Sequence, residues 1–206
     1  MGMPDNPRTS WLLQAKDLSF RLGDHRVLGP LNFSVGPGLT WACGGDGRGK
    51  TTLLRLMAGR LLPTAGSLSR KVATTFDHDT TDPALNQIDL QSWLSGLQDR
   101  YPQWDPAVQT RLAAAWALSD HLHKPFYMLS AGSRRKAGLL AAAASGAELT
   151  LLDTPFAALD AASGRVLIQL LTEARQSQAR AWVVADPQRS PAFHGGGSIN
   201  FIDLGD

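Results

Sequence analysis

Residues 43–52 read Cys43-Gly44-Gly45-Asp46-Gly47-Arg48-Gly49-Lys50-Thr51-Thr52. This segment follows the apolar residues 38–42 and leads into an apolar helical pattern over residues 53–58. It matches the spacing G-x-x-x-x-G-K-[ST], in which backbone N–H groups close on phosphate oxygens at a helix N-terminus. An ordinary glycine-rich turn is the alternative, but the strand and helix patterns on both sides favour a phosphate-binding loop.

Three residues of this loop have expected roles of their own. Lys50 is expected to hold the β- and γ-phosphates of a nucleotide, and the Thr51 hydroxyl to bind Mg²⁺. Gly47 adds a flexible position where the loop must wrap tightly around its ligand.

The composition limits what can surround the loop. With 206 residues, 43% of them hydrophobic, the chain can bury the core of one domain with a small insert. The net charge of +2 gives no indication of a nucleic-acid partner, and the run Arg134-Arg135-Lys136 is typical of a solvated helix face. The single cysteine, Cys43, excludes an internal disulfide. Its place after an apolar strand indicates a small buried residue in a reducing compartment rather than a nucleophile.

We expect no targeting segment and no membrane span. Residues 1–10 are polar and contain proline. No apolar run reaches the roughly 18–20 residues that a bilayer requires. Any membrane role is therefore expected to come through a partner protein, without direct insertion.

The N-terminal part reads as strands. Alternation of apolar and polar residues predicts two strands, at 11–20 and 26–35, joined by a turn at Gly23-Asp24. They should form a short antiparallel sheet ahead of the loop. Ala58-Gly59 predicts a helix end, and residues 67–76 show a weak strand pattern.

The pattern changes between residues 83 and 126. Apolar residues recur there at helical spacing on both sides of the break at Tyr101-Pro102, which predicts a helical insert. Its aromatic residues are expected to form a small core of the insert rather than a ligand cage. These residues are Trp93, Tyr101, Trp104 and Trp116.

Strands and helices alternate in the remainder of the chain. Ser130 is placed as the N-cap of an alanine-rich helix that runs to Ser145. Residues 149–153 predict a buried strand that ends in Asp153, as a strand carrying an Mg²⁺-site aspartate does. After a helix at about 161–174, residues 181–185 predict a final core strand, followed by Asp186.

Together these patterns predict an α/β fold with a mostly parallel sheet and nucleotide bound at the carboxyl ends of its strands. Lys50, Asp153 and Asp186 should then lie at one edge of that sheet.

The chain resembles the ATP-binding subunits of ABC transporters, in particular the short ATPases of the haem-export system used in cytochrome c maturation. Four segments carry the resemblance: the Walker A motif at 44–52, the signature Leu129-Ser130-Ala131-Gly132, the Walker B strand at 149–153, and the D-loop Ala158-Leu159-Asp160. The signature is the diagnostic part. A phosphate-binding loop alone also admits kinases, but a P-loop kinase would leave the signature unexplained.

The resemblance implies a single ABC-type ATP-binding domain over residues 1–206. Its P-loop NTPase core would comprise 1–82 and 127–206, with N-terminal antiparallel strands and the helical insert at 83–126. It implies ATP and Mg²⁺ as ligands, with Mg²⁺ held by Thr51 and Asp153.

The resemblance also implies partners. In the family, the signature serine and glycine, here Ser130 and Gly132, contact the γ-phosphate of nucleotide held by the opposite subunit. We therefore expect a homodimer, or a heterodimer with another ABC ATPase. A membrane-embedded subunit is expected to dock near residues 77–83 and to hold the chain at the inner, cytoplasmic face of the cell membrane.

Several positions depart from the family pattern. Thr154 occupies the position of the catalytic glutamate and cannot accept a proton near neutral pH. Asp186 occupies the position of the switch histidine and would add negative charge near the γ-phosphate.

Three further groups of the family pattern are absent. Residues 76–79 lack the Q-loop glutamine, Ser133 replaces the signature glutamine, and Phe20 is the nearest substitute for an adenine-stacking aromatic expected near Leu22. Two functions remain open: an ATPase that drives a transporter, and a weakly hydrolysing module that pairs with a competent ABC ATPase.

Overall fold

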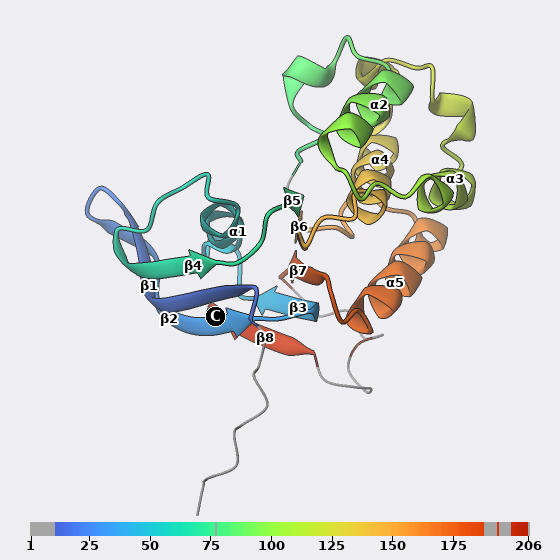
Figure 1. Ribbon diagram of the computed structural model, residues 1–206. Helices are drawn as coiled ribbons and strands as arrows, with labels where there is room; N and C mark the ends of the chain where they lie inside the picture. Colours follow the sequence, from blue (N-terminus) through green and yellow to red (C-terminus); the bar gives the residue numbers. More distant parts are fainter. Residues whose placement is uncertain (1–10, 77, 188–192, 194–198, 206) are drawn as a thin grey trace, which may run out of the picture.

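The computed structural model describes residues 11–76, 78–187, 193 and 199–205. Two sheets organise this part of the chain, as Figure 1 shows. An antiparallel sheet has the order β2-β1-β4, formed by β1 (Leu13–Leu22), β2 (His25–Val35) and β4 (Ala65–Arg70). A parallel sheet has the order β5-β6-β7-β3-β8, formed by β3 (Gly38–Cys43), β5 (Thr75–Phe76), β6 (Leu149–Asp153), β7 (Ala181–Ala185) and β8 (Asn200–Asp203).

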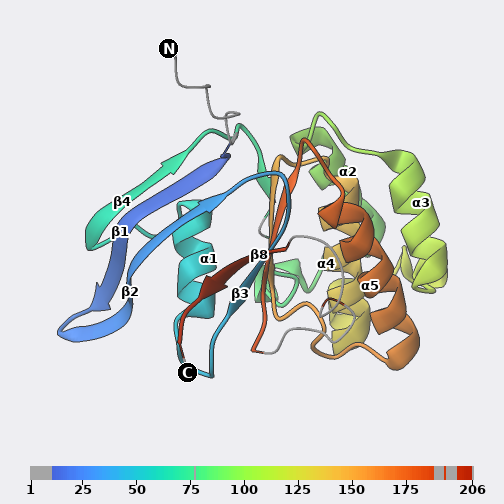
Figure 2. The same ribbon diagram turned by 90° about the horizontal axis from the view of Figure 1, so that it is seen from below.

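The helices lie on both sides of the parallel sheet. Helix α1 (Lys50–Ala58) packs between the two sheets, an arrangement that Figure 2 shows from below. On the other side, α4 (Ala131–Ala144) and α5 (Ala161–Arg175) cover the parallel strands, and α2 (Leu90–Arg100) and α3 (Pro106–Ala115) pack against α4. Three short 3₁₀ turns lie in the segments around α2 and α3, at Pro83–Leu85, Ser119–His121 and Phe126–Met128.

The α/β fold predicted from the sequence is confirmed. Strands β3, β6 and β7 are buried along nearly their whole length, because helices cover both of their faces. Such strands read as continuous apolar runs. The antiparallel β1 and β2 alternate buried and exposed residues instead, as strands with one solvated face do.

Residues 67–76 do not form one strand. The structure divides them between β4, which pairs antiparallel with β1, and the two-residue β5, which pairs parallel with β6. The chain thus leaves one sheet and enters the other within this segment. Each strand is defined by a partner far away in the sequence, which a local pattern does not contain.

The strand at 181–185 is not the last one. Strand β8 follows it and pairs parallel with β3 at the edge of the sheet, with Trp41 opposite Phe201. The only β8 residue whose side chain is buried is Ile202. An edge strand with one buried side chain has little apolar signal of its own.

Of the four named aromatic residues of the expected insert, three are buried and Trp104 is half-buried, but they do not form a separate core. Trp93, Tyr101 and Trp116 belong to an apolar cluster that continues to Trp41 on β3 and Trp182 on β7. Two hydrogen bonds also link these aromatic side chains to the rest of the fold. The Tyr101 hydroxyl donates to the Thr75 carbonyl at 3.0 Å, and Trp116 Nε1 donates to the Ser163 carbonyl at 3.2 Å. The helices at 90–115 are therefore packed onto the sheet region as part of one cluster.

The half-buried side chain of Arg180 lies at the C-terminal end of α4. The guanidinium of Arg180 donates to the carbonyl oxygens of Ala142, Ala143 and Ala147 at 2.9–3.1 Å, and it lies 5.2 Å from the Trp182 ring centroid. Burial lowers the Arg180 pKa to about 10, so the group remains charged at neutral pH. The Ala142 carbonyl also accepts from the Ser145 hydroxyl at 2.9 Å, so the guanidinium is a second donor there, and it is the side-chain donor to the Ala143 and Ala147 carbonyls.

Candidate nucleotide-binding site

Residues 44–49 form a loop between β3 and α1. Gly47 and Gly49 have φ values of 75° and 83°, in the left-handed region that favours glycine. A Cβ atom on Gly49 would lie 2.8 Å from the carbonyl oxygen of Val27, so a side chain there would push the loop away from β2. Gly49 is also the N-cap of α1, whose first residue is Lys50. The positive end of the helix therefore faces the loop, as anion binding requires.

Lys50 lies inside this loop. Its side chain is mostly buried, with an exposed fraction of 8%. Nζ donates to the carbonyl oxygens of Gly44 and Gly45, both at 2.7 Å. An ammonium group has three donors, so this geometry leaves one for a further acceptor. The loop thus holds a cation at the place predicted from the sequence.

Thr51 and Asp153 meet at the edge of the parallel sheet. The Thr51 hydroxyl donates to Asp153 Oδ2 at 2.6 Å, which joins the first turn of α1 to the end of β6. The two oxygen groups fit a hard cation such as Mg²⁺, which usually binds one or two protein oxygens, phosphates and waters. In the described part of the chain, no group of three or more His, Cys, Asp or Glu side chains could hold a metal alone. A bound Mg²⁺ would neutralise phosphate charge beside these two residues.

A cavity of about 340 Å³ lies above the loop and brings most of the predicted residues together. It is lined by Val27, Asp46, Gly47, Gly49, Lys50, Thr51, Thr52, Asp153, Thr154 and Pro187. Gly44 and Gly45 contribute through the carbonyl groups that hold Lys50. Arg48 lines a neighbouring cavity of about 280 Å³ with His25 and Arg26 instead. Sequence reasoning missed Val27, a β2 residue with no motif to mark it.

Thr154 lines this cavity in a strained backbone conformation. Its φ is 43°, which is unusual for a β-branched residue, and its N–H donates to the Ala185 carbonyl at 2.7 Å. The side chain offers a hydroxyl and no carboxylate. Thr154 therefore lines the cavity but has no group that could accept a proton from water at neutral pH.

Asp186 lies one strand away from Thr154. Asp153 and Ala185 are partners in the parallel pairing of β6 with β7, so Thr154 and Asp186 each follow a paired residue. The Asp186 N–H donates to the Ala42 carbonyl at 3.2 Å, and the residue is half-buried. Its neighbour Pro187 lines the cavity. Asp153 ends β6, Asp186 follows β7, and Lys50 follows β3 through the loop, so the three lie at the carboxyl ends of neighbouring strands, as expected.

The signature residues lie apart from this cavity. Ser130 is the N-cap of α4 and accepts from the Ser133 N–H at 3.1 Å, as predicted. Ser130 is exposed, and neither Ser130 nor Gly132 is among the residues that line the cavity of its own chain. Gly132 packs against the D-loop instead, where a Cβ would lie 2.8 Å from the Ala158 carbonyl oxygen.

A salt bridge joins the signature helix to the D-loop. Lys136 Nζ lies 3.2 Å from Asp160 Oδ2, and Asp160 is also the N-cap of α5. Hydrogen bonds from the Ser163 N–H and hydroxyl, followed by the Lys136 bond and charge, lower the Asp160 pKa to about 2. The carboxylate is therefore ionised throughout the neutral range.

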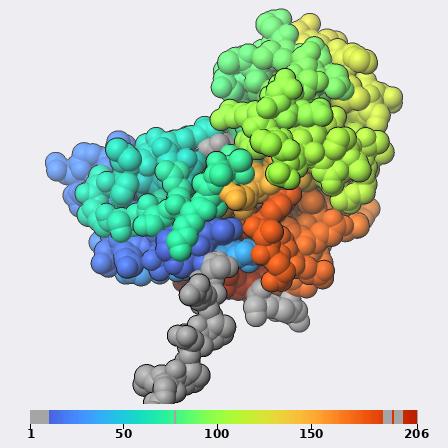
Figure 3. Space-filling model, viewed as in Figure 1, coloured from blue at the N-terminus to red at the C-terminus, as the bar shows by residue number. Residues whose placement is uncertain are grey.

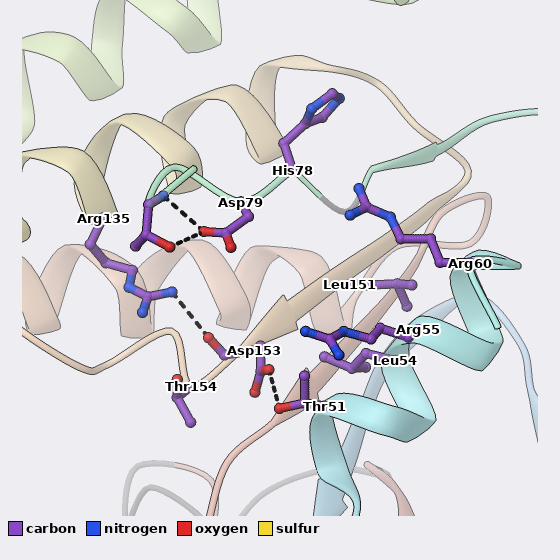
Figure 4. Close-up of a pocket in the computed structure, with 11 residues that line it drawn as sticks. Thr51, Leu54, Arg55, Arg60, His78, Asp79, Arg135, Leu151, Asp153 and Thr154 are labelled. Carbon is purple, nitrogen blue, oxygen red and sulfur yellow. Dashed lines mark hydrogen bonds between the residues drawn. The ribbon is translucent and has the colours of Figure 1, made fainter. Parts of the chain in front are cut away.

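A second cavity, of about 270 Å³, adjoins the first at Thr51, Asp153 and Thr154 (Figure 4). Arg135 of α4 reaches this place and donates to the Asp153 carbonyl at 3.1 Å. Sequence reasoning took Arg135 as part of a solvated face and missed this contact.

His78 and Asp79 occupy the same cavity, where the family has its Q-loop; Asp77 lies outside the described residues. Asp79 accepts from the Thr81 N–H and hydroxyl, at 2.8 and 2.6 Å. Burial raises the pKa of Asp79, but these bonds and the charges of Arg135 and Arg60 outweigh it and hold the pKa below its ordinary value. An ionised carboxylate therefore faces the arginines of this cavity.

Phe20 is not brought to the site. Its half-buried ring packs against the apolar cluster of β1, β2 and α1, and it is not among the residues that line either cavity beside the loop. These contacts do not support Phe20 as the substitute for an adenine-stacking aromatic, and that role stays a prediction. Cys43, the last residue of β3, is half-buried.

The strand, glycine loop and helix around Lys50, with Asp153 at the end of a neighbouring parallel strand, define a P-loop nucleotide-binding domain. Helix α4, which Ser130 of the signature caps, and the D-loop beside it are the features that distinguish an ABC-type domain from other P-loop domains. A family model for ABC transporters matches residues 28–157, and the chain belongs to this family as an ATP-binding subunit. Members of the family bind ATP, usually with Mg²⁺, and act with membrane transporter components.

Curated relatives support the assignment to this family. The chain is 35% identical over 150 residues to the cytochrome c biogenesis ATP-binding export protein CcmA of Novosphingobium aromaticivorans, covering 72% of this chain and 74% of that protein. It is 31% identical over 179 residues to CcmA of Xylella fastidiosa (strain 9a5c), covering 78% and 77%.

A solved structure confirms the fold. The structure of an ABC transporter ATP-binding protein from Pyrococcus furiosus superposes with a TM-score of 0.74 at 20% identity, covering 93% of this chain and 96% of that one. At this identity the likeness bears on the fold alone.

Proposed function

We propose that this chain is the ATP-binding subunit of a haem-export type transporter that serves cytochrome c biogenesis. The observation that carries the proposal is the intact phosphate cradle, in which Lys50 is fixed by two carbonyl groups and Thr51 by Asp153. The relatives named as cytochrome c biogenesis export proteins support the choice of pathway. The domain would span residues 1–206, with a core at 1–82 and 127–206 and the insert at 83–126.

Mg·ATP would bind in the cavity above the loop. The backbone of residues 44–49 and the side chains of Lys50 and Thr52 would hold its phosphates, and Thr51 and Asp153 would hold Mg²⁺. Asp46 and Arg48 would border the nucleotide from the outer side of the loop, where both are exposed.

A second ATP-binding subunit would complete the site. Ser130 and Gly132 do not line the cavity of their own chain, and Ser130 is exposed at a helix N-terminus. In a head-to-tail dimer these groups would contact the γ-phosphate in the opposite subunit. The partner is a second copy of the chain or another ABC ATPase.

The membrane-embedded subunit would dock where the helices at 90–115 meet the sheet, near residues 77–83. Among the described residues, no helix is both long and apolar enough to cross a bilayer. The chain would therefore lie at the cytoplasmic face of the cell membrane through this partner. Expression with and without neighbouring membrane subunits, followed by membrane fractionation, tests this; a chain that never sediments with membranes contradicts it.

A second candidate function follows from Thr154 and Asp186. Thr154 supplies no general base, whose loss typically costs about 10²–10⁴ in rate. In this case the chain would bind nucleotide, close on a competent ABC ATPase and hydrolyse little itself.

Steady-state ATP hydrolysis separates the two functions. The purified chain should be assayed alone and with its membrane partner, with Lys50→Ala as the blank. Turnover well above that of Lys50→Ala supports the driving subunit. Turnover equal to the blank in both settings, with ATP still bound, supports the regulatory module.

A further inference from the structure

Asp46 is a carboxylate at the nucleotide cavity that the phosphate cradle does not use. The described residues that line this cavity of about 340 Å³ include two carboxylates, Asp46 and Asp153. Asp153 already accepts the Thr51 hydroxyl at 2.6 Å, and these two residues would hold Mg²⁺. Asp46 is exposed, and its side chain makes no hydrogen bond or ion pair with any residue that the structure describes. The cavity therefore has one carboxylate that is available to a water molecule.

A tight turn fixes Asp46 next to the cation of the loop. The Arg48 N–H donates to the Gly45 carbonyl at 3.4 Å, and Gly47, in the third position of this turn, has a φ of 75°. The same Gly45 carbonyl accepts from Lys50 Nζ at 2.7 Å. Asp46 directly follows this shared acceptor, so it is held close to the ammonium group that would bind the γ-phosphate. The charge of Lys50 also offsets part of the repulsion between the Asp46 carboxylate and the phosphates.

Two other acidic residues near the site are less suited to accept a proton from water. Burial raises the pKa of Asp79 in the adjoining cavity, but hydrogen bonds from Thr81 and the charge of Arg135 outweigh this and hold the pKa below its ordinary value. A carboxylate with a lowered pKa is a poor proton acceptor. Asp186 is not among the described residues that line the nucleotide cavity. Asp46 therefore fits the role better than either of them.

We propose that Asp46 is the general base of ATP hydrolysis in this chain, in place of the glutamate that is absent at Thr154. This inference rests on the proposed ATPase role and names the residue that carries out its chemical step. Asp46 accepts a proton from a water molecule as the water oxygen attacks the γ-phosphorus. The bond between the γ-phosphorus and the oxygen that bridges to the β-phosphate breaks, and its electron pair remains on ADP. Asp46 then releases the proton to the phosphate product.

The second ATP-binding subunit would enclose this carboxylate. In the single chain Asp46 is exposed to solvent. In the proposed head-to-tail dimer, Ser130 and Gly132 of the partner subunit would approach the γ-phosphate and exclude bulk water from this side of the cavity. Such exclusion strengthens the interaction between a carboxylate and the attacking water. The turnover that Asp46 supports is therefore expected under conditions in which the dimer forms.

Removal of the carboxylate tests the inference in the full chain. ATP turnover at saturating Mg·ATP is measured for the parent and Asp46→Asn, alone and with the neighbouring membrane subunits, with Lys50→Ala as the blank. Asp46→Asn should lose about 10²–10⁴-fold in turnover, or fall to the level of the blank, because an amide has the size of a carboxylate but accepts no proton. Calorimetry should show that it still binds ATP, which excludes misfolding.

Asp99→Asn is the matched control for this substitution. Asp99 is exposed on α2 and does not line the nucleotide cavity. Figure 3 shows this helical region, in green, apart from the blue strands of the antiparallel sheet. The control should keep the turnover of the parent.

Rescue by formate separates a catalytic role from a structural one. Asp46→Ala leaves a space in which a small carboxylate can accept the proton, so added formate should raise the turnover of this variant several-fold. Formate should not raise the turnover of Asp46→Asn, whose amide fills the same space. A loss in Asp46→Asn without rescue of Asp46→Ala overturns the inference, because Asp46 would then act on the loop and not on water.

The remaining outcomes distinguish failure of the inference from failure of the ATPase role. If the parent turns over well above Lys50→Ala and Asp46→Asn equals the parent, the inference is overturned while the ATPase role stands. A loss in Asp186→Asn would then assign the base to Asp186. If the parent binds ATP but turns over no faster than Lys50→Ala in both settings, the ATPase role and the inference fail together.

Discussion

Gly132 on α4 meets the carbonyl oxygen of Ala158 at a distance that leaves no room for a side chain, since a Cβ there would lie 2.8 Å from that oxygen. The contact joins the start of the signature helix to the loop before α5, where Ala158 itself has a φ of 62°. The Lys136 to Asp160 salt bridge lies one turn further along α4. The signature and the D-loop therefore form one unit, and a shift of either must move the other.

We predict that Gly132→Ala weakens ATP-driven dimerisation by about tenfold, on the order of 1.4 kcal/mol, and leaves ATP binding by the single chain unchanged. The added methyl would push the Ala158 loop away from α4, while the nucleotide cavity lies elsewhere. Light scattering with saturating Mg·ATP measures dimerisation, and calorimetry measures ATP affinity.

Gly96→Ala is the matched control for this substitution. Gly96 lies in α2 with no atom within 4 Å of an added Cβ, so alanine there should stabilise the helix and leave the dimer intact. Equal dimerisation of the two variants would show that the Ala158 contact is unimportant. A parent chain that stays monomeric at saturating ATP, alone and with any paralogue, would contradict the dimer itself.

We predict that Lys50→Ala abolishes ATP binding. The substitution removes the cation of the loop, which contributes about 1.5–3 kcal/mol for each charge-assisted hydrogen bond to phosphate. It also frees the carbonyl groups of Gly44 and Gly45, which Lys50 holds at 2.7 Å. Calorimetric titration with Mg·ATP checks the prediction. Lys71→Ala controls for the loss of a lysine, because Lys71 is exposed over the Trp11 ring. Comparable affinity in Lys50→Ala and parent would refute it.

Local sequence patterns predict the structure correctly where it depends on residues that are close in the sequence. The loop at 44–49, the N-cap Ser130 and the strand ending at Asp153 all depend on residues a few positions apart, and each lies where the sequence predicts. The spacing of glycine, lysine and threonine sets the backbone directly, which explains why the phosphate cradle was predictable.

Other features depend on partners distant in the chain. The division of residues 67–76 between two sheets follows from pairing with β1 and with β6. Likewise, β8 is a strand because it pairs with β3 at the edge of the parallel sheet. Arg135 reaches Asp153 only because α4 packs beside β6, so its basic run resembled a solvated face. Val27 enters the cavity because β2 passes over Gly49. Such contacts require the folded arrangement.

We predict that Arg180→Met lowers the free energy of unfolding by about 2–4 kcal/mol. The change removes the guanidinium from the carbonyl groups of Ala143 and Ala147, and an unsatisfied buried group costs about 1–3 kcal/mol. The Ala142 carbonyl loses one of two donors, because it keeps the hydrogen bond from the Ser145 hydroxyl. Urea denaturation followed by circular dichroism measures the loss. Arg165→Met removes an exposed arginine and should change stability by less than about 0.5 kcal/mol. Equal midpoints for the two variants would show that water replaces the guanidinium.

We predict that Thr154→Glu combined with Asp186→His raises ATP turnover by one to three decades, about 1.4–4 kcal/mol of barrier. Glutamate supplies a carboxylate to activate water, and histidine replaces a negative charge by a hydrogen-bond donor to the γ-phosphate. Glutamate is not β-branched, so a φ of 43° should strain it no more than threonine. Phosphate release by the double variant and the parent, both saturated with Mg·ATP, gives the comparison.

The two substitutions should not act independently. Thr154 and Asp186 each follow one member of the Asp153 to Ala185 register pair, and the Thr154 N–H bonds to the Ala185 carbonyl, so the positions are neighbours. Thr154→Glu alone should gain less, because a new carboxylate beside Asp153 and Asp186 has its pKa raised by like charge and is partly protonated. Thr154→Gln with Asp186→His is the isosteric control without a base. A double variant that binds ATP normally but turns over no faster than this control would place the limit at the missing Q-loop glutamine or in another subunit. A parent chain that already hydrolyses at an ordinary transporter rate would show that Asp186 or another acid serves as the base.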